Sequence, residues 1–161
     1  MIIVWEGIIL CAIFSLSVFM ISKNPINTLY NYPPKIQQRV KSLAEYKDKI
    51  PTKKNKLAIK GCALLIFLII ISIILKYGNQ CTTFYESFIT GFILWTIVNL
   101  WDVIILDIIW FCHDKRFVIK GAEDMTKEYH NYWFHIKGFL IGEFLAIVIC
   151  SLSGIIIQYV L

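Results

Sequence analysis

The hydropathy pattern of this chain is dominated by four long apolar stretches, separated by polar segments. They cover about residues 2–21, 57–77, 84–112 and 133–160. Each reaches the length of about 20 residues that an α-helix needs to cross the hydrocarbon core of a bilayer. They are too long and continuous for a water-soluble core, and they lack the alternation of a membrane β-barrel. The pattern predicts an all-α fold, a bundle of four transmembrane helices that makes residues 1–161 one membrane domain.

The distribution of charge predicts how this bundle is oriented. Lys and Arg are concentrated in the segments 22–56 and 113–132 and at their borders, whereas the short segment between the second and third stretches has only Lys76 beside it. The positive-inside rule places both long loops in the cytoplasm, and therefore both termini on the extracytoplasmic side. The expected location is the plasma (inner) membrane, as a multi-pass protein. Abundant Ile, Lys and Asn are typical of an AT-rich bacterial genome.

The first cytoplasmic loop contains apolar residues at helical spacing. Ile36, Val40 and Leu43 recur at intervals of four and three, which predicts a short amphipathic helix on the inner leaflet. A basic loop that only fixes orientation is the alternative. Four lysines border the second stretch: Lys53, Lys54, Lys56 and Lys60. We expect them to attract anionic lipid headgroups by roughly 1 kcal/mol each. Because they adjoin a membrane helix, nucleic acid is not an expected partner.

Three carboxylates lie inside the apolar stretches: Asp102 and Asp107 in the third, and Glu143 in the fourth. An ionisable side chain at membrane depth is costly, so it marks a functional site by default. The third and fourth stretches are joined by a short loop, so their helices are expected to be antiparallel neighbours. A rise of about 1.5 Å per residue then places Asp102 and Glu143 at a similar level near the midplane. The same estimate places Lys137 close to the level of Asp107.

The α-helical period defines which of these groups share a face. At about 3.6 residues per turn, Trp95, Asn99 and Asp102 fall on one stripe of the third helix, whereas Asp107 lies well off it. The predicted site therefore consists of Asn99, Asp102 and Glu143, with Trp95 as a wall and Asp107 assisting. Two nearby carboxylates in a low dielectric share a proton. The leading hypothesis is a protein that binds or moves a polar solute or ion. The alternative is a structural or regulatory subunit in which these charges only join helices.

A second polar cluster lies at the cytoplasmic rim and supports a rival hypothesis. Its members are His113, Asp114, Glu123, His130 and His135. Imidazoles and carboxylates together can perform acid–base chemistry, here on a lipid or isoprenoid headgroup. Their spacing matches no metal motif such as HExxH, although His113 and His135 at similar depth permit haem ligation. The five cysteines form no CxxC pair. The identity of any metal or cofactor therefore stays open.

Small residues predict where helices pack most closely. The fourth stretch has one at every fourth position, namely Gly138, Gly142, Ala146, Cys150 and Gly154. The first stretch carries a shorter version in Gly7, Cys11 and Ser15. Small-xxx-small strips allow two helix backbones to approach closely. The two strips are expected to pack together within one chain or, alternatively, to form the contact of a homo-oligomer.

Overall fold

The computed structural model describes residues 2–161, with the backbone alone described for residues 53–56. The described part is helical and contains no strand. Four segments in it are long and apolar enough to cross a membrane: Ile2–Ile21, Leu57–Gly78, Phe84–Phe111 and Thr126–Tyr159. The four predicted helices are therefore confirmed, with ends that differ by a few residues, except that the fourth segment includes a short helix in the preceding loop. The four helices indicate a multi-pass membrane protein.

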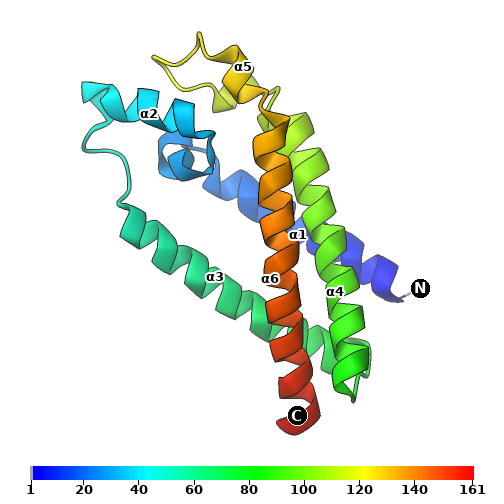
Figure 1. Cartoon of the computed structure of the whole chain (residues 1–161). Coiled ribbons are helices and arrows are strands. Elements are labelled where there is room, and N and C mark those ends of the chain that lie inside the picture. Colours follow the sequence, from blue (N-terminus) through cyan, green and yellow to red (C-terminus); the bar gives the residue numbers. More distant parts are fainter. Residues whose placement is uncertain (1) are drawn as a thin grey trace.

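The helices α4 (Phe84–Trp101) and α6 (Tyr132–Tyr159) form the central pair of the molecule. They run side by side in opposite directions, as Figure 1 shows. Helix α1 (Ile2–Ile21) crosses behind this pair and packs mainly on α4. Helix α3 (Lys53–Ile73) diverges from the pair at its start and reaches α6 near its end. There the hydroxyl groups of Ser72 and Ser153 lie 2.8 Å apart.

The small residues of α6 pack against α4, which corrects the expectation that they would meet α1. A Cβ atom added to Gly142 would lie 2.7 Å from Asn99 Oδ1, and one added to Gly154 would lie 2.8 Å from a ring carbon of Phe84. Nothing lies within 4 Å of the corresponding position at Gly138. The strip is thus covered by α4 within the chain from Gly142 to Gly154. A contact between copies through this part of α6 would have to displace α4.

The small residues of α1 also face α4 instead of α6. A Cβ atom on Gly7 would lie 3.2 Å from the side chain of Ile97. Further along α1, Ser15 Oγ accepts a hydrogen bond of 2.9 Å from the indole N–H of Trp101. Because α4 lies between α1 and α6, both small-residue strips are used by the same central helix.

The third membrane segment is only partly an α-helix. From Asp102 to Phe111 it is a ten-residue π-helix, and a shorter one, Ile74–Gly78, ends the second segment. The hydrogen bonds of a π-helix join residues five apart, as in the 3.0 Å bond from Cys112 N to Asp107 O at the end of the longer one. Such helices are rare and often occur at functional sites. The wider turn brings residues five apart, such as Asp102 and Asp107, closer to the same side than an α-helix does.

The two long loops fold together into a compact cap at one end of the bundle. The first loop contributes a 3-10 helix, Pro25–Asn31, and helix α2 (Pro34–Ser42), while the second contributes helix α5 (Thr126–Tyr129). Their buried side chains form one apolar cluster of Ile26, Leu29, Tyr32, Ile36, Val40, Tyr46, Phe117, Ile119, Ala122 and Tyr129. The predicted amphipathic helix is present, but the second loop covers its apolar face. It therefore does not present that face to a leaflet.

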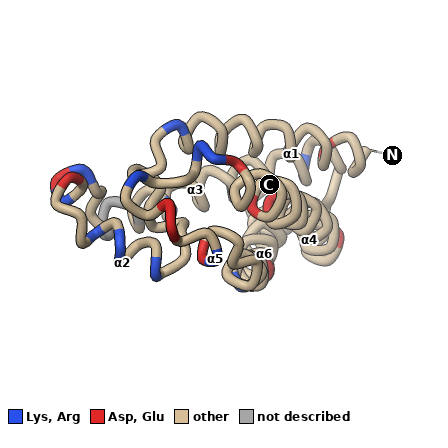
Figure 2. Tube along the Cα trace, turned by 90° about the horizontal axis from the view of Figure 1, so that it is seen from above, with Lys and Arg blue, Asp and Glu red and all other residues tan. Residues whose placement is uncertain are grey.

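Polar contacts between the two loops fix the cap. Tyr32 Oη donates a hydrogen bond of 3.0 Å to Phe117 O, and Ile119 N donates one of 3.0 Å to Tyr129 Oη. Arg39 Nε donates to the carbonyl of residue 121 at 3.1 Å. Many of the other Lys and Arg lie along the loops around α2 and α5 (Figure 2). The side chains of Lys53, Lys54 and Lys56 lie outside the described residues, whereas Lys60 is described and exposed.

The opposite end of the bundle is closed by contacts to the short loop between α3 and α4. Asn79 Nδ2 donates to both carboxylate oxygens of Glu6, at 3.1 and 2.9 Å. Phe84 N donates to Gln158 Oε1 at 2.8 Å. The first turn of α1 and the last turn of α6 therefore lie at this loop, away from the cap. The side of the membrane on which this end lies stays a prediction.

Candidate functional site

One polar group inside the α4–α6 pair is built around Glu143. Its Oε1 accepts a hydrogen bond of 2.7 Å from Asn99 Nδ2, and its Oε2 accepts one of 2.9 Å from Thr96 Oγ1. Asn99 Nδ2 also donates to Phe139 O at 3.0 Å. The structure thus brings together two predicted site residues, Asn99 and Glu143. The sequence prediction missed Thr96, although its position three residues before Asn99 on the same helical face was a usable signal.

A second polar group joins the π-helix to the start of α6. Asp107 Oδ2 lies 3.0 Å from Nδ1 of His135, whose ring is buried between Phe111 and Phe134. The other ring nitrogen, Nε2, has no hydrogen-bond partner among the described residues. His135 was expected at the rim and is instead an interior residue. The ring is buried because Phe111 and Asp107 of the π-helix pack against this position of α6.

Lys137 forms no ion pair with Asp107 among the described side chains, although the depth estimate places the two at a similar level. Its Nζ lies 5.6 Å from the ring centre of Trp133, and the side chain is exposed. Two features explain the difference: the π-helix changes the direction of Asp107, and Lys137 lies two residues beyond His135 on α6. Residues two positions apart on a helix point in different directions, so His135 and Lys137 cannot both face Asp107.

Asp102 lies between the two polar groups and is half-buried. It interacts electrostatically with Asp107 and with His135. Among the described side chains, no hydrogen bond joins Asp102 to Glu143, whose two oxygens accept from Asn99 and Thr96 instead. The expected acid pair is therefore not a direct pair. Asn99 connects the two carboxylates, since it bonds Glu143 and shares a cavity wall with Asp102.

The cavity beside Asp102 has a volume of about 490 Å³ and lies between α1, α3 and the α4–α6 pair. Trp95, which was expected as a wall, lines it together with Phe67, and the two rings meet edge to face at 4.8 Å. Of the described lining residues, Asp102 is the one acid and Lys60 the one base. The other lining groups are mostly apolar. The cavity therefore offers a carboxylate in surroundings that favour an apolar body.

The rim cluster is only partly assembled. The rings of His113 and His130 lie 5.1 Å apart, and Tyr132 Oη lies 3.4 Å from His113 Nε2. Each histidine uses Nδ1 on a backbone carbonyl, that of Ile108 at 2.9 Å and that of Thr126 at 2.8 Å. His113 therefore meets His130 and not His135, which removes the geometric basis for haem ligation by His113 and His135.

The two rim carboxylates serve local turns. Asp114 accepts hydrogen bonds from the guanidinium and the backbone N–H of Arg116. It also accepts one of 3.0 Å from the indole N–H of Trp110. The hydrogen bonds from Arg116 lower the pKa of Asp114 to about 2. Glu123 accepts a hydrogen bond of 2.7 Å from the backbone N–H of Gly121. In the described part of the chain, no three His, Cys, Asp or Glu side chains gather in a way that would hold a metal ion.

The interior polar residues form a series from Glu143 through Asn99 and Asp102 to Asp107 and His135. Neighbouring members share a hydrogen bond, a cavity wall or an electrostatic interaction. The series extends from the middle of the α4–α6 pair towards the cap, and it opens to the cavity at Asn99 and Asp102. Ionisable residues inside membrane helices often mark ion pathways or proton relays.

No protein-family model, curated protein or solved structure matches this chain.

Proposed function

We propose that this chain is an integral membrane protein that binds a small organic cation at Asp102. The observation that carries the proposal is the half-buried carboxylate on the wall of a mostly apolar cavity. A desolvated carboxylate favours a positive partner, because the attraction is much stronger there than in water. Trp95 and Phe67 add aromatic surface to the same wall, and aromatic rings attract cations. An apolar wall then selects a cation that carries an apolar body.

Membrane insertion is part of this proposal and is supported by the outer surfaces of the helices. Leu16 is 61% exposed on α1, and Leu65 and Ile66 are 62% and 58% exposed on α3. Large contiguous apolar surfaces of this kind are rare on water-soluble monomers. The basic cap then lies in the cytoplasm by the positive-inside rule.

Release of the solute on the other side of the membrane would need an additional opening. A second copy or a partner would supply it, at a surface other than the covered α6 strip.

The Asp107–His135 pair gives the proposed site a link to protons. His135 is charged only when protonated, and it interacts electrostatically with Asp102. A positive His135 reduces the attraction of Asp102 for a cation, so each event opposes the other by the same coupling free energy. A divalent metal is a weaker choice of ligand. Ca²⁺ takes six or more oxygen ligands, whereas Asp102, Asn99 and Ser17 are the lining side chains that offer oxygen.

Binding of tetraphenylphosphonium to the purified full-length protein in detergent tests the proposal. We expect Asp102→Asn to weaken binding by about tenfold or more, since it removes the charge and keeps the side-chain volume. Glu143→Gln should bind nearly as the unchanged chain, because Glu143 is already engaged by Asn99 and Thr96. Asp114→Asn, on the cap, is the second control.

Triphenylphosphine oxide, which is neutral and carries three of the same phenyl groups on phosphorus, helps to separate charge from apolar fit. We expect it to bind weakly and to be insensitive to Asp102→Asn. Equal affinity of the cation for the unchanged chain and Asp102→Asn would refute the proposed cation site. The rival function, acid–base chemistry at the rim, has less support because Asp114 and Glu123 are held by local turns.

A further inference from the structure

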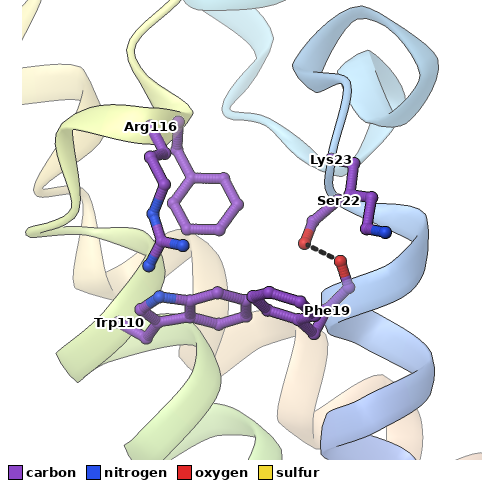
Figure 3. A pocket seen from close by; sticks show the side chains of 6 residues that line it. Phe19, Ser22, Lys23, Trp110 and Arg116 are labelled. Carbon is purple, nitrogen blue, oxygen red and sulfur yellow. Dashed lines mark hydrogen bonds between the residues drawn. The ribbon is translucent and has the colours of Figure 1, made fainter.

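A second cavity lies where the end of α1 meets the end of the π-helix and the cap. Its volume is about 300 Å³. It is lined by Phe19, Ser22, Lys23, Trp110, Arg116 and Phe117. None of these residues belongs to the Asp102 site, and they come from separate parts of the chain. The loop after α1 supplies one wall, and the turn after the third membrane segment supplies the opposite wall (Figure 3).

Aromatic rings form the floor of this cavity. The rings of Phe19 and Trp110 stack with centroids 6.0 Å apart and planes at 20°. Phe117 meets Trp110 edge to face at 5.0 Å. Figure 3 shows Arg116 and Lys23 on opposite sides above this floor. The cavity therefore combines an apolar base with cations at its mouth.

The two cations differ in how they are held. Arg116 is fixed by Asp114, and its guanidinium carbon lies 5.7 Å from the Trp110 ring centre. A guanidinium has five N–H donors, of which Asp114 occupies those on Nε and one Nη. Lys23 is exposed and forms no ion pair with any side chain that the structure describes. Since Asp114 balances Arg116, the charge of Lys23 is left without a counter-ion at the cavity mouth.

We propose that this cavity binds the phosphate group of an anionic phospholipid, between Lys23 and Arg116. The exposed apolar surface of α1 continues from the cavity along Phe19, Met20 and Leu16. A free phosphate ion has no use for that surface, whereas a lipid places its upper acyl chains there. The cavity also lies where the segments Ile2–Ile21 and Phe84–Phe111 both end, which is the headgroup level if they cross a bilayer. The inference rests on the membrane insertion proposed above and not on the Asp102 site.

Titration of the full-length protein in detergent with dilauroyl phosphatidylglycerol and dilauroyl phosphatidylcholine tests this site. Thermal stability and native mass spectrometry report bound lipid. We expect phosphatidylglycerol to bind selectively and Lys23→Gln to weaken it by about fivefold, the effect of one cation near an anionic headgroup. Lys115→Gln removes a charge from the same turn as Arg116 without touching the cavity, and we expect it to bind as the unchanged chain.

Three results would overturn the inference. Equal binding of the two lipids would remove the role of headgroup charge. Equal losses in Lys23→Gln and Lys115→Gln would indicate diffuse surface attraction and no defined site. Stabilisation by inorganic phosphate, sensitive to Lys23→Gln and without any effect of lipid, would assign the cavity to the free ion. Lys23 lies in a loop outside the apolar cluster of the cap, so its variant should fold. Tetraphenylphosphonium binding by Lys23→Gln shows separately whether the Asp102 site is intact.

Discussion

His135 of α6 and Asp107 of the π-helix form a buried contact, with Nδ1 and Oδ2 3.0 Å apart. The side chain of His135 is only 4% exposed, whereas that of Asp107 is 34% exposed. The contact joins the third and fourth membrane segments just beneath the cap. It exists because the π-helix turns Asp107 towards α6, where an α-helix would direct it elsewhere. The pair therefore couples the geometry of the π-helix to the position of α6.

A double-mutant cycle on this pair measures that coupling. We expect Asp107→Asn and His135→Gln each to lower the free energy of unfolding by about 1–3 kcal/mol, because each leaves a partner unpaired in the interior. The double variant should lose less than the sum of the two, by about 1 kcal/mol. Reversible unfolding in mixed micelles provides the values. Strictly additive losses would show that the two side chains do not stabilise each other.

Gly142 and Gly138 offer a matched pair of substitutions on α6. An alanine at residue 142 would push against Asn99, whose amide atoms lie 2.7 and 2.8 Å from the added Cβ. We expect Gly142→Ala to cost about 1–3 kcal/mol of stability, because Asn99 must move away from Glu143. Gly138→Ala meets nothing within 4 Å and should be neutral or stabilising by up to about 1 kcal/mol.

Thermal unfolding of both variants in the same detergent checks this difference. The comparison is internal, since both are Gly-to-Ala changes on one helix and differ only in what lies opposite. Similar melting temperatures for the two would contradict the close approach of α4 and α6 at Asn99. A loss at Gly138→Ala alone would indicate that the open face at that position is in use by another molecule.

The parts of the fold that follow from apolar length were predictable, and those that follow from local backbone choice were not. The four helices could be read from hydropathy. The depth estimate was less exact, because it placed Glu143 level with Asp102, whereas Glu143 bonds Asn99 and Thr96, three and six residues before Asp102. The π-helix could not be predicted, because the apolar run around Asp107 suits α and π geometry equally. The pairing of His135 with Asp107 depends on that choice and was missed for the same reason.

The cap was missed because its contacts join residues far apart in the sequence. Tyr32 bonds the carbonyl of Phe117 across 85 positions, and no periodicity in either loop predicts such a pairing. A usable signal was present nevertheless. Tyr32, Phe117 and Tyr129 are large aromatic residues in segments that are otherwise polar, and each is buried. Aromatic residues within charged loops indicate that the loops have an apolar core of their own.

Tyr32→Phe should weaken the cap specifically. The change removes the hydroxyl that donates a hydrogen bond of 3.0 Å to Phe117 O. The buried carbonyl then lacks this partner. We expect a cost of about 1–2 kcal/mol. Initial trypsin cleavage within residues 35–49 should then be about fivefold to tenfold faster, because cleavage follows the population of the opened cap. Tyr30→Phe is the control, since the structure describes no hydrogen bond for the Tyr30 hydroxyl. Equal cleavage rates for the two variants would contradict the proposed role of this bond.

Cys81, in the short loop opposite the cap, should react slowly with a water-soluble maleimide. Its side chain is 5% exposed, and burial raises the pKa of the thiol, with the charges of Glu86 and Glu6 adding to the effect. The thiolate is the reactive form, so a raised pKa leaves little of it at pH 7. We expect the alkylation rate of Cys81 to keep rising with pH beyond about 8.5, the ordinary pKa of a free thiol.

A cysteine at the exposed neighbouring position, Thr82→Cys in a Cys81→Ala chain, is the control. It should react at least about tenfold faster at pH 7, and its rate should level off near the ordinary thiol pKa. Peptide mass spectrometry reads each site separately, and matching rates for the two thiols at pH 7 would show that Cys81 is not shielded.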